Sequence, residues 1–142
     1  LRWDSLGEYM ALGASLEHLS TQFDNPGAKI LANALDTATG RYLENGRIPS
    51  RRMNEIDNRG STFYLTFYWA QALAEQTADV DLAKRFGSVA SALAENEEKI
   101  VAELTDVQGK AQNLGGYYMP DPTLVTAAMC PSETLNAIID GV

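Results

Sequence analysis

Residues 61–74 read Ser-Thr-Phe-Tyr-Leu-Thr-Phe-Tyr-Trp-Ala-Gln-Ala-Leu-Ala and form the aromatic centre of this 142-residue chain. We expect a helix here, capped by Ser61 or Thr62 and buried on most of its sides by large apolar rings. A base-stacking platform for nucleic acid is the less favoured interpretation, because no basic residue is interleaved among the rings.

Two amphipathic helices are expected before this aromatic helix. The first begins with a capping box of Ser5 and Glu8, and its apolar residues recur at helical spacing, which predicts one buried stripe. The second begins at Asn25, an N-cap residue, followed by Pro26 at the first helical position. It ends at residues 45–46, Asn-Gly, where glycine adopts the left-handed conformation cheaply.

A fourth, long helix is expected after the aromatic one, from Asp79 or Asp81 to Gly109, with Gly87 marking either a kink or a close crossing. A tail of a loop and two short helices follows, in which Asp121-Pro122 and Pro131-Ser132 each resemble a cap with a proline near the helix start. The chain is therefore predicted to be mainly α, a bundle of about four main helices with a short helical tail, in one unit over residues 1–142. The predicted core includes Leu16, Leu35, Phe67, Leu73, Phe86 and Leu93.

Composition and charge exclude several classes of protein. The chain carries 11 basic and 19 acidic residues, a net charge of −8, which disfavours a general binder of nucleic acid or of anionic membranes. Apolar runs are too short for a membrane span and no export signal is visible, so we expect a soluble, cytoplasmic protein. Because the chain opens at Leu1, directly before a helix start, it reads as a segment of a longer protein.

Residues that commonly carry catalysis or bind metals are sparse. Cys130 is the only cysteine and has no neighbouring metal-ligand partner, so a buried or bland thiol in a reducing compartment is expected. His18 is the only histidine and lacks a partner carboxylate or nucleophile at a known spacing. The acidic group at residues 95–98 is interpreted as a solvated helix face. We predict no catalytic residue and no metal ligand in this segment.

The positive charge is concentrated in one stretch. Residues 46–60, here called the basic loop, lose the helical pattern and hold two glycines, a proline and four arginines. Arg51 and Arg52 follow Pro49 and would present two planar guanidinium groups, which suit phosphate or carboxylate oxygens. One interpretation pairs the arginines with nearby carboxylates such as Glu55 and Asp57. The other is a fixed anion site in which Arg2 takes part.

Several segments, in the same order, resemble the C-terminal end of the monomeric-type NADP-dependent isocitrate dehydrogenases, and the resemblance covers the whole chain. They are Leu-Arg-Trp-Asp-Ser-Leu-Gly-Glu at 1–8, Ser-Leu-Glu-His-Leu at 15–19, Ile-Asp-Asn-Arg-Gly-Ser at 56–61, Phe-Tyr at 63–64, Tyr-Trp-Ala-Gln-Ala-Leu-Ala at 68–74 and Gly-Gly-Tyr-Tyr at 115–118.

This resemblance implies part of the large domain of a longer, two-domain α/β enzyme. Such enzymes oxidise isocitrate with NADP and Mg²⁺ or Mn²⁺ to 2-oxoglutarate and carbon dioxide, act as monomers, and carry their isocitrate and metal ligands upstream of this segment. By the same resemblance, Arg2 and Arg51 hold the 2′-phosphate of NADP and Asp4 is a nearby polar contact, so the basic loop is a coenzyme-phosphate loop. Arg52 stays open as a residue that shares or replaces the role of Arg51.

A different class of function remains possible from the residues alone. The chain could be an independent helical interaction module that packs against a partner through its aromatic helix. Its basic loop would then bind an acidic partner. A gene that encodes only this segment would favour the module, whereas a gene with a long upstream region would favour the enzyme.

Overall fold

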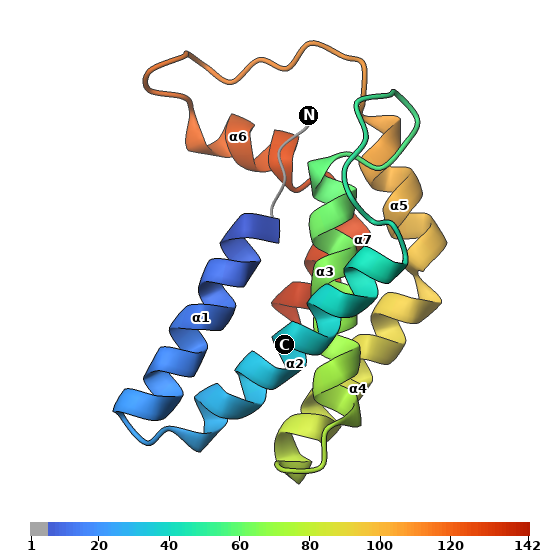
Figure 1. Ribbon diagram of the computed structural model, residues 1–142. Helices are drawn as coiled ribbons and strands as arrows, with labels where there is room; N and C mark the ends of the chain where they lie inside the picture. The colour runs from blue at the N-terminus through green and yellow to red at the C-terminus, as the bar shows by residue number, and fades with distance from the viewer. Residues whose placement is uncertain (1–5) are drawn as a thin grey trace.

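The computed structural model of the protein describes residues 6–142, and the regular secondary structure in that range is helical (Figure 1). Asn25 caps α2 by accepting a hydrogen bond from the backbone N–H of Ala28, and Asp79 caps α4 in the same way through Leu82, as the sequence predicts. The seven helices are α1 Leu6–Gln22, α2 Pro26–Glu44, α3 Asn58–Glu75, α4 Val80–Glu95, α5 Glu97–Asp106, α6 Pro122–Met129 and α7 Glu133–Asp140.

Helix α3 is the centre of the molecule and packs against α2 on one side and α4 on another (Figure 1). Its side chains Phe63 and Phe67 are buried, with their rings stacked at 5.9 Å between centroids. Leu35 of α2 and Leu93 of α4 close the core around them. The expectation of a helix buried on most sides is confirmed, and an interaction module working through these rings is contradicted, because the chain's own core already covers them.

Five of the six predicted core residues are buried, and Phe86 is the exception. It is only partly buried and packs at the edge of the cluster that contains Leu73. The predicted cap of α3 is also wrong. The helix begins three residues before Ser61, and Asp57 is the N-cap, accepting from the backbone N–H of Arg59. Ser61 lies in the first turn instead, where its buried hydroxyl is hydrogen-bonded to that of Tyr42 at 2.6 Å.

The long fourth helix is interrupted. Asn96 leaves the helical conformation at φ −111° and ψ 10°, so α4 ends at Glu95 and α5 starts at Glu97. The Asn96 side chain donates to the carbonyl of Ala92, a local bond that competes with helix continuation. Gly87 does not mark a close crossing, because it lies inside α4 with open space where a side chain would project.

The predicted buried stripe of α1 is wrong in part. Only Leu16 is buried, while Met10, Leu12 and Leu19 are 61%, 40% and 42% exposed. Tyr9 does make contacts, with its ring edge-on to Trp69 of α3 and its hydroxyl 3.1 Å from Thr66. One face of α1 therefore packs on the bundle, and the remaining apolar residues are uncovered.

The two short tail helices, α6 and α7, are confirmed, with Asp121 and Ser132 as their caps. Helix α7 packs against α4 and α5. Glu103 of α5 fixes the start of α7 by accepting from the hydroxyl of Ser132 at 2.6 Å and from the backbone N–H of Thr134 at 3.2 Å. Among residues 6–142, none of the helices has the length and apolar character that a membrane crossing requires.

Candidate functional site

The basic loop connects α2 to α3, and its last three residues, 58–60, belong to the first turn of α3. Arg47 anchors its beginning. The guanidinium carbon of Arg47 lies 3.8 Å from the centre of the Tyr64 ring, and its Nε donates to the Tyr68 hydroxyl at 3.3 Å. Its Nη2 is 3.9 Å from a carboxylate oxygen of Glu97 on α5.

Glu97 also accepts a hydrogen bond of 2.8 Å from the Tyr64 hydroxyl. Burial, together with this bond to a carboxylate, raises the pKa of Tyr64 to about 12. The interpretation of Glu97 as part of a solvated face is therefore wrong, because it ties α5 to α3 and to the start of the basic loop. No sequence pattern indicates this, since the partners are 33 residues apart.

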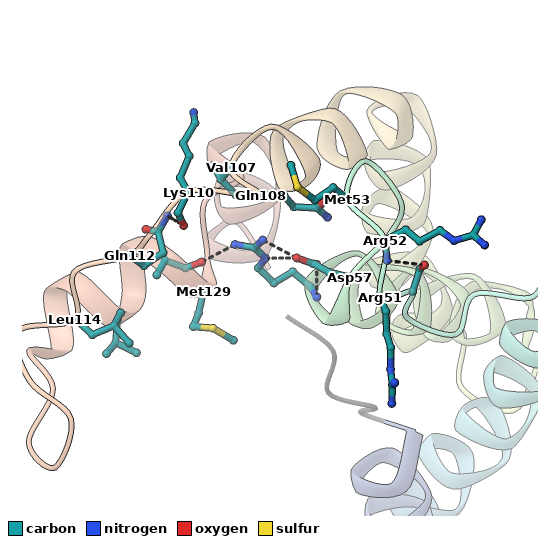
Figure 2. A pocket seen from close by; sticks show the side chains of 15 residues that line it. Arg51, Arg52, Met53, Asp57, Val107, Gln108, Lys110, Gln112, Leu114 and Met129 are labelled. Carbon is teal, nitrogen blue, oxygen red and sulfur yellow. Dashed lines mark hydrogen bonds and ion pairs between the residues drawn. The ribbon is translucent and has the colours of Figure 1, made fainter.

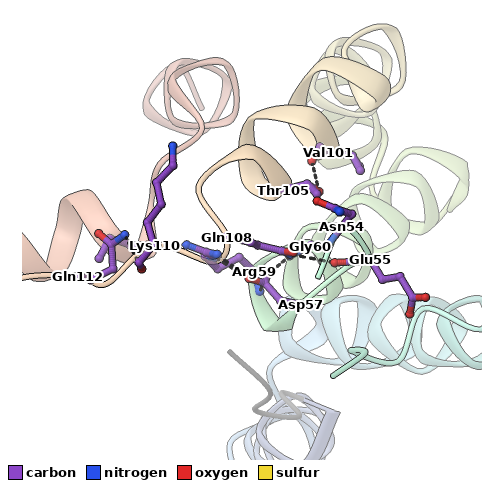
Figure 3. Close-up of polar contacts among 11 residues, drawn as sticks. Asn54, Glu55, Asp57, Arg59, Gly60, Val101, Thr105, Gln108, Lys110 and Gln112 are labelled. Atoms are coloured by element: carbon purple, nitrogen blue, oxygen red, sulfur yellow. Dashed lines mark hydrogen bonds and ion pairs between the residues drawn. The ribbon is translucent and has the colours of Figure 1, made fainter. Parts of the chain in front are cut away.

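Arg59 anchors the other end of the basic loop. It forms an ion pair with Asp57 through Nε and Nη2 (Figure 3). Its Nη1 donates to the carbonyl of Ala128, near the end of α6, at 2.9 Å. The side chains of Arg59 and Asp57 are 9% and 5% exposed. Arg59 thus joins the loop to α6, and its guanidinium group is already occupied by contacts within the chain.

The middle of the basic loop is a closed turn. Its ends meet where the backbone N–H of Ser50 donates to the carbonyl of Ile56 at 2.8 Å. Inside the turn, the Ser50 hydroxyl donates to Glu55 and accepts from the backbone N–H of Arg52 at 3.1 Å. Arg51 therefore projects from a backbone that is hydrogen-bonded on both sides of it.

The arginines of this region differ in how their guanidinium groups are paired. Arg41 donates to both carboxylate oxygens of Glu75 across α2 and α3. Arg52 is 84% exposed and only loosely paired with Glu55, at 3.8 Å. Arg51 is exposed and makes no side-chain hydrogen bond or ion pair with another residue of the range 6–142. Pairing with carboxylates thus accounts for most of the arginines but not for Arg51.

A hollow of about 520 Å³ lies between the basic loop, the C-terminal end of α5 and α6. Arg51, Arg52 and Arg59 line it together with Lys110, so its cationic groups come from two separate segments. Figure 2 shows the side chains of Arg51 and Arg52 pointing in different directions. The two neighbouring guanidinium groups therefore do not converge on one anion in this conformation.

Other predicted site residues are placed as follows. Arg2 and Asp4 lie outside the described residues. Cys130 and His18 are both exposed, so neither is a buried functional group. Within the part of the chain that the structure describes, no three His, Cys, Asp or Glu side chains gather where they could hold a metal ion.

Gln108, at the end of α5, is a site residue that sequence reasoning missed. Its amide reaches the basic loop and bonds two backbone groups there (Figure 3). Glutamine in a polar stretch after a helix carries no recognisable signal. The contact exists only because α5 ends beside a loop some 50 residues earlier in the chain.

The chain matches the family model described as monomeric isocitrate dehydrogenase over residues 1–140. It is 58% identical over 139 residues to isocitrate dehydrogenase (NADP) 2 of Colwellia maris and 55% identical over 139 residues to isocitrate dehydrogenase (NADP) of Azotobacter vinelandii. Isocitrate dehydrogenase (NADP) 2 of Mycobacterium tuberculosis is 53% identical over 142 residues. These matches cover 98–100% of this chain and 19% of each relative, so the chain spans about a fifth of their length.

Proposed function

Because this chain belongs to the monomeric isocitrate dehydrogenase family, we propose that it is the C-terminal portion of an enzyme that oxidises and decarboxylates isocitrate to 2-oxoglutarate with NADP. The names of its relatives support this reaction. By the family resemblance, the whole enzyme is a cytoplasmic monomer, this portion lies in its large domain, and the isocitrate and Mg²⁺ or Mn²⁺ ligands lie in the remainder of the protein.

The role of this portion is to hold the 2′-phosphate of NADP through Arg51. One observation carries this assignment: among the arginines around the basic loop, Arg51 is the one without a partner in residues 6–142. The loop that presents it is tied to the helices through Arg47 at its start and Asp57 at its end. An exposed guanidinium on an anchored backbone fits a phosphate, which it can bind with two parallel hydrogen bonds.

Arg2 and Asp4 complete the phosphate site by the family resemblance, as a second guanidinium group and a nearby polar contact. NADP differs from NAD by this phosphate, so cationic side chains, and no redox group, are what coenzyme choice requires. Arg52 is the less suitable ligand because it is already loosely paired with Glu55 and points away from Arg51 (Figure 2).

The test is Arg51→Ala in the full-length enzyme, with Arg52→Ala as the matched control that removes the same charge one residue away. A hydrogen bond to a charged group contributes about 1.5–3 kcal/mol, so Arg51→Ala should weaken NADP by roughly ten-fold to a hundred-fold and NAD by little. Arg52→Ala should have a much smaller effect on the ratio of kcat/KM values for the two coenzymes. An Arg51 variant that keeps the wild-type ratio would remove the role from this residue.

A further inference from the structure

We propose that Gln108 is a positioning residue for coenzyme choice, because it holds the turn of the basic loop that carries Arg51. This inference rests on the proposed function of Arg51 and extends it to a residue on a different element. Gln108 lies just beyond the C-terminal end of α5. It does not touch the coenzyme phosphate in this assignment, and acts through the backbone of residues 53–55.

The evidence is a pair of hydrogen bonds from one side-chain amide. The Oε1 atom of Gln108 accepts from the backbone N–H of Asn54 at 2.9 Å, and its Nε2 atom donates to the carbonyl of Glu55 at 2.8 Å (Figure 3). A side-chain amide such as that of glutamine is neutral and can satisfy one N–H and one C=O at the same time through its oxygen and its nitrogen. Both the Oε1 and the Nε2 atom of Gln108 are therefore hydrogen-bonded to the basic loop.

The backbone at this point needs support. Asn54 is in the left-handed region at φ 64°, a conformation that costs free energy for a residue with a side chain. The next residue after Gln108 adds a second contact to the same turn. Gly109 has φ 73°, and a Cβ there would lie 2.4 Å from the Met53 side-chain Cε. Residues 108 and 109 thus both contact the turn at residues 53–55.

Arg51 depends on this contact because it lies in the same closed turn, three residues before Asn54. Arg47 and Asp57 fix the ends of the basic loop, but the Ser50–Ile56 bond encloses a segment whose tip is held from outside by Gln108. Without that bond, the tip and the Arg51 side chain sample more conformations. Binding of the phosphate must then order them, which lowers affinity for NADP and leaves NAD unaffected.

The experiment uses the full-length enzyme with Gln108→Ala and Gln108→Met, and measures the dissociation constants of NADP and NAD by calorimetry. Methionine keeps the approximate shape of the side chain but makes neither hydrogen bond. Both variants lose two neutral hydrogen bonds at an exposed site where water competes, and they should bind NADP about five- to tenfold more weakly, with NAD changed by less than about twofold. Gln22→Ala, an exposed glutamine at the far end of α1, is the control and should bind both like the wild type.

The outcomes separate this inference from the function it rests on. If Arg51→Ala leaves NADP binding unchanged, the phosphate role itself fails. If Arg51→Ala weakens NADP while Gln108→Ala and Gln108→Met do not, only the positioning role is overturned. An equal loss of NADP and NAD, or full recovery in Gln108→Met, would show that Gln108 acts through general stability or packing and would also overturn it.

Discussion

Replacing Glu103 by glutamine should weaken the docking of α7 on the bundle while leaving the helical core intact. The Glu103 carboxylate uses both oxygens as acceptors: Oε2 accepts from the Ser132 hydroxyl at 2.6 Å and the Thr134 N–H at 3.2 Å, and Oε1 from the Thr134 hydroxyl at 2.8 Å. Glutamine has the same shape but replaces one oxygen by an NH₂ group. The Thr134 hydroxyl can turn to accept from that NH₂ group, but the substitution removes the negative charge, so the remaining hydrogen bonds lose their charge assistance.

The magnitude follows from the number and exposure of these bonds. A hydrogen bond to a charged group contributes roughly 1.5–3 kcal/mol, but solvent competes here because the Glu103 side chain is 26% exposed. The negative charge also lies at the N-terminus of α7, where the helix dipole favours it. We therefore expect the free energy of undocking α7 to fall by about 1–2 kcal/mol, which raises the undocked population roughly five- to thirtyfold.

Amide hydrogen exchange of residues 133–140 measures this population directly. Exchange in α7 should accelerate by the same factor in Glu103→Gln, while amides of α3 keep their protection. The matched control is Glu98→Gln, an exposed glutamate on the same helix, which should change neither. Unchanged exchange in α7, or uniform acceleration throughout the chain, would refute the idea that this carboxylate docks the tail.

The docking should also depend on pH. The hydrogen bond from Ser132, followed by those from Thr134, lowers the pKa of Glu103. A lowered pKa means that the ionised form is stabilised in the docked state. The contribution is therefore fully present above about pH 4.3, the ordinary value for glutamate, and is lost as the pH falls through the lowered pKa. The exchange difference between the wild type and Glu103→Gln should close over that acidic range.

Three further predictions concern the core, a buried phenol and the chain alone. Leu93→Ala, at a side chain with 0% exposure, should lower the free energy of unfolding in urea by about 2–5 kcal/mol, whereas Val80→Ala, at 75% exposure, should change it by less than about 0.5 kcal/mol. The raised pKa of Tyr64 means that its neutral form stabilises the fold below about pH 10, and that this contribution is lost between pH 10 and about 12. In Tyr64→Phe the alkaline part of the stability profile should therefore be flatter. The 142-residue chain alone should form no NADPH when it is given NADP, isocitrate and Mg²⁺, and turnover by the purified chain would contradict its assignment as an incomplete portion.

The starts of α2, α4 and α7 were predictable because capping is a local interaction. Asn25 before Pro26, Asp79, and Ser132 each accept a hydrogen bond from a backbone N–H three residues further on, so the signal lies within one helical turn. The aromatic run of α3 also indicated burial correctly, since large rings cover most of the circumference of the helix. The same local logic failed for Ser61, because Asp57 offers an equally good cap four residues earlier.

The family resemblance lay in the residues as well, and with it the identity of Arg51 as a candidate ligand. The sequence could not show, however, which arginines pair with other groups of the chain and which stay available to a ligand. Charge density alone left every arginine of the basic region as a possible anion ligand or a possible ion-pair partner. Arg59 is a structural anchor because the packing of α6 places the Ala128 carbonyl beside it. Arg47 is one because α3 and α5 place Tyr68 and Glu97 beside it.

Gln108 shows why this part of the site was beyond sequence reasoning. Its two hydrogen bonds join residues that are separated by 53 and by 54 positions in the sequence. Neither partner lies in a local sequence pattern that predicts the contact. Helix propensity and capping act within one turn, so they appear in the sequence itself. Which arginine is left without a partner depends on the long-range partners that the packed helices place beside the others, and that is a property of the assembled core.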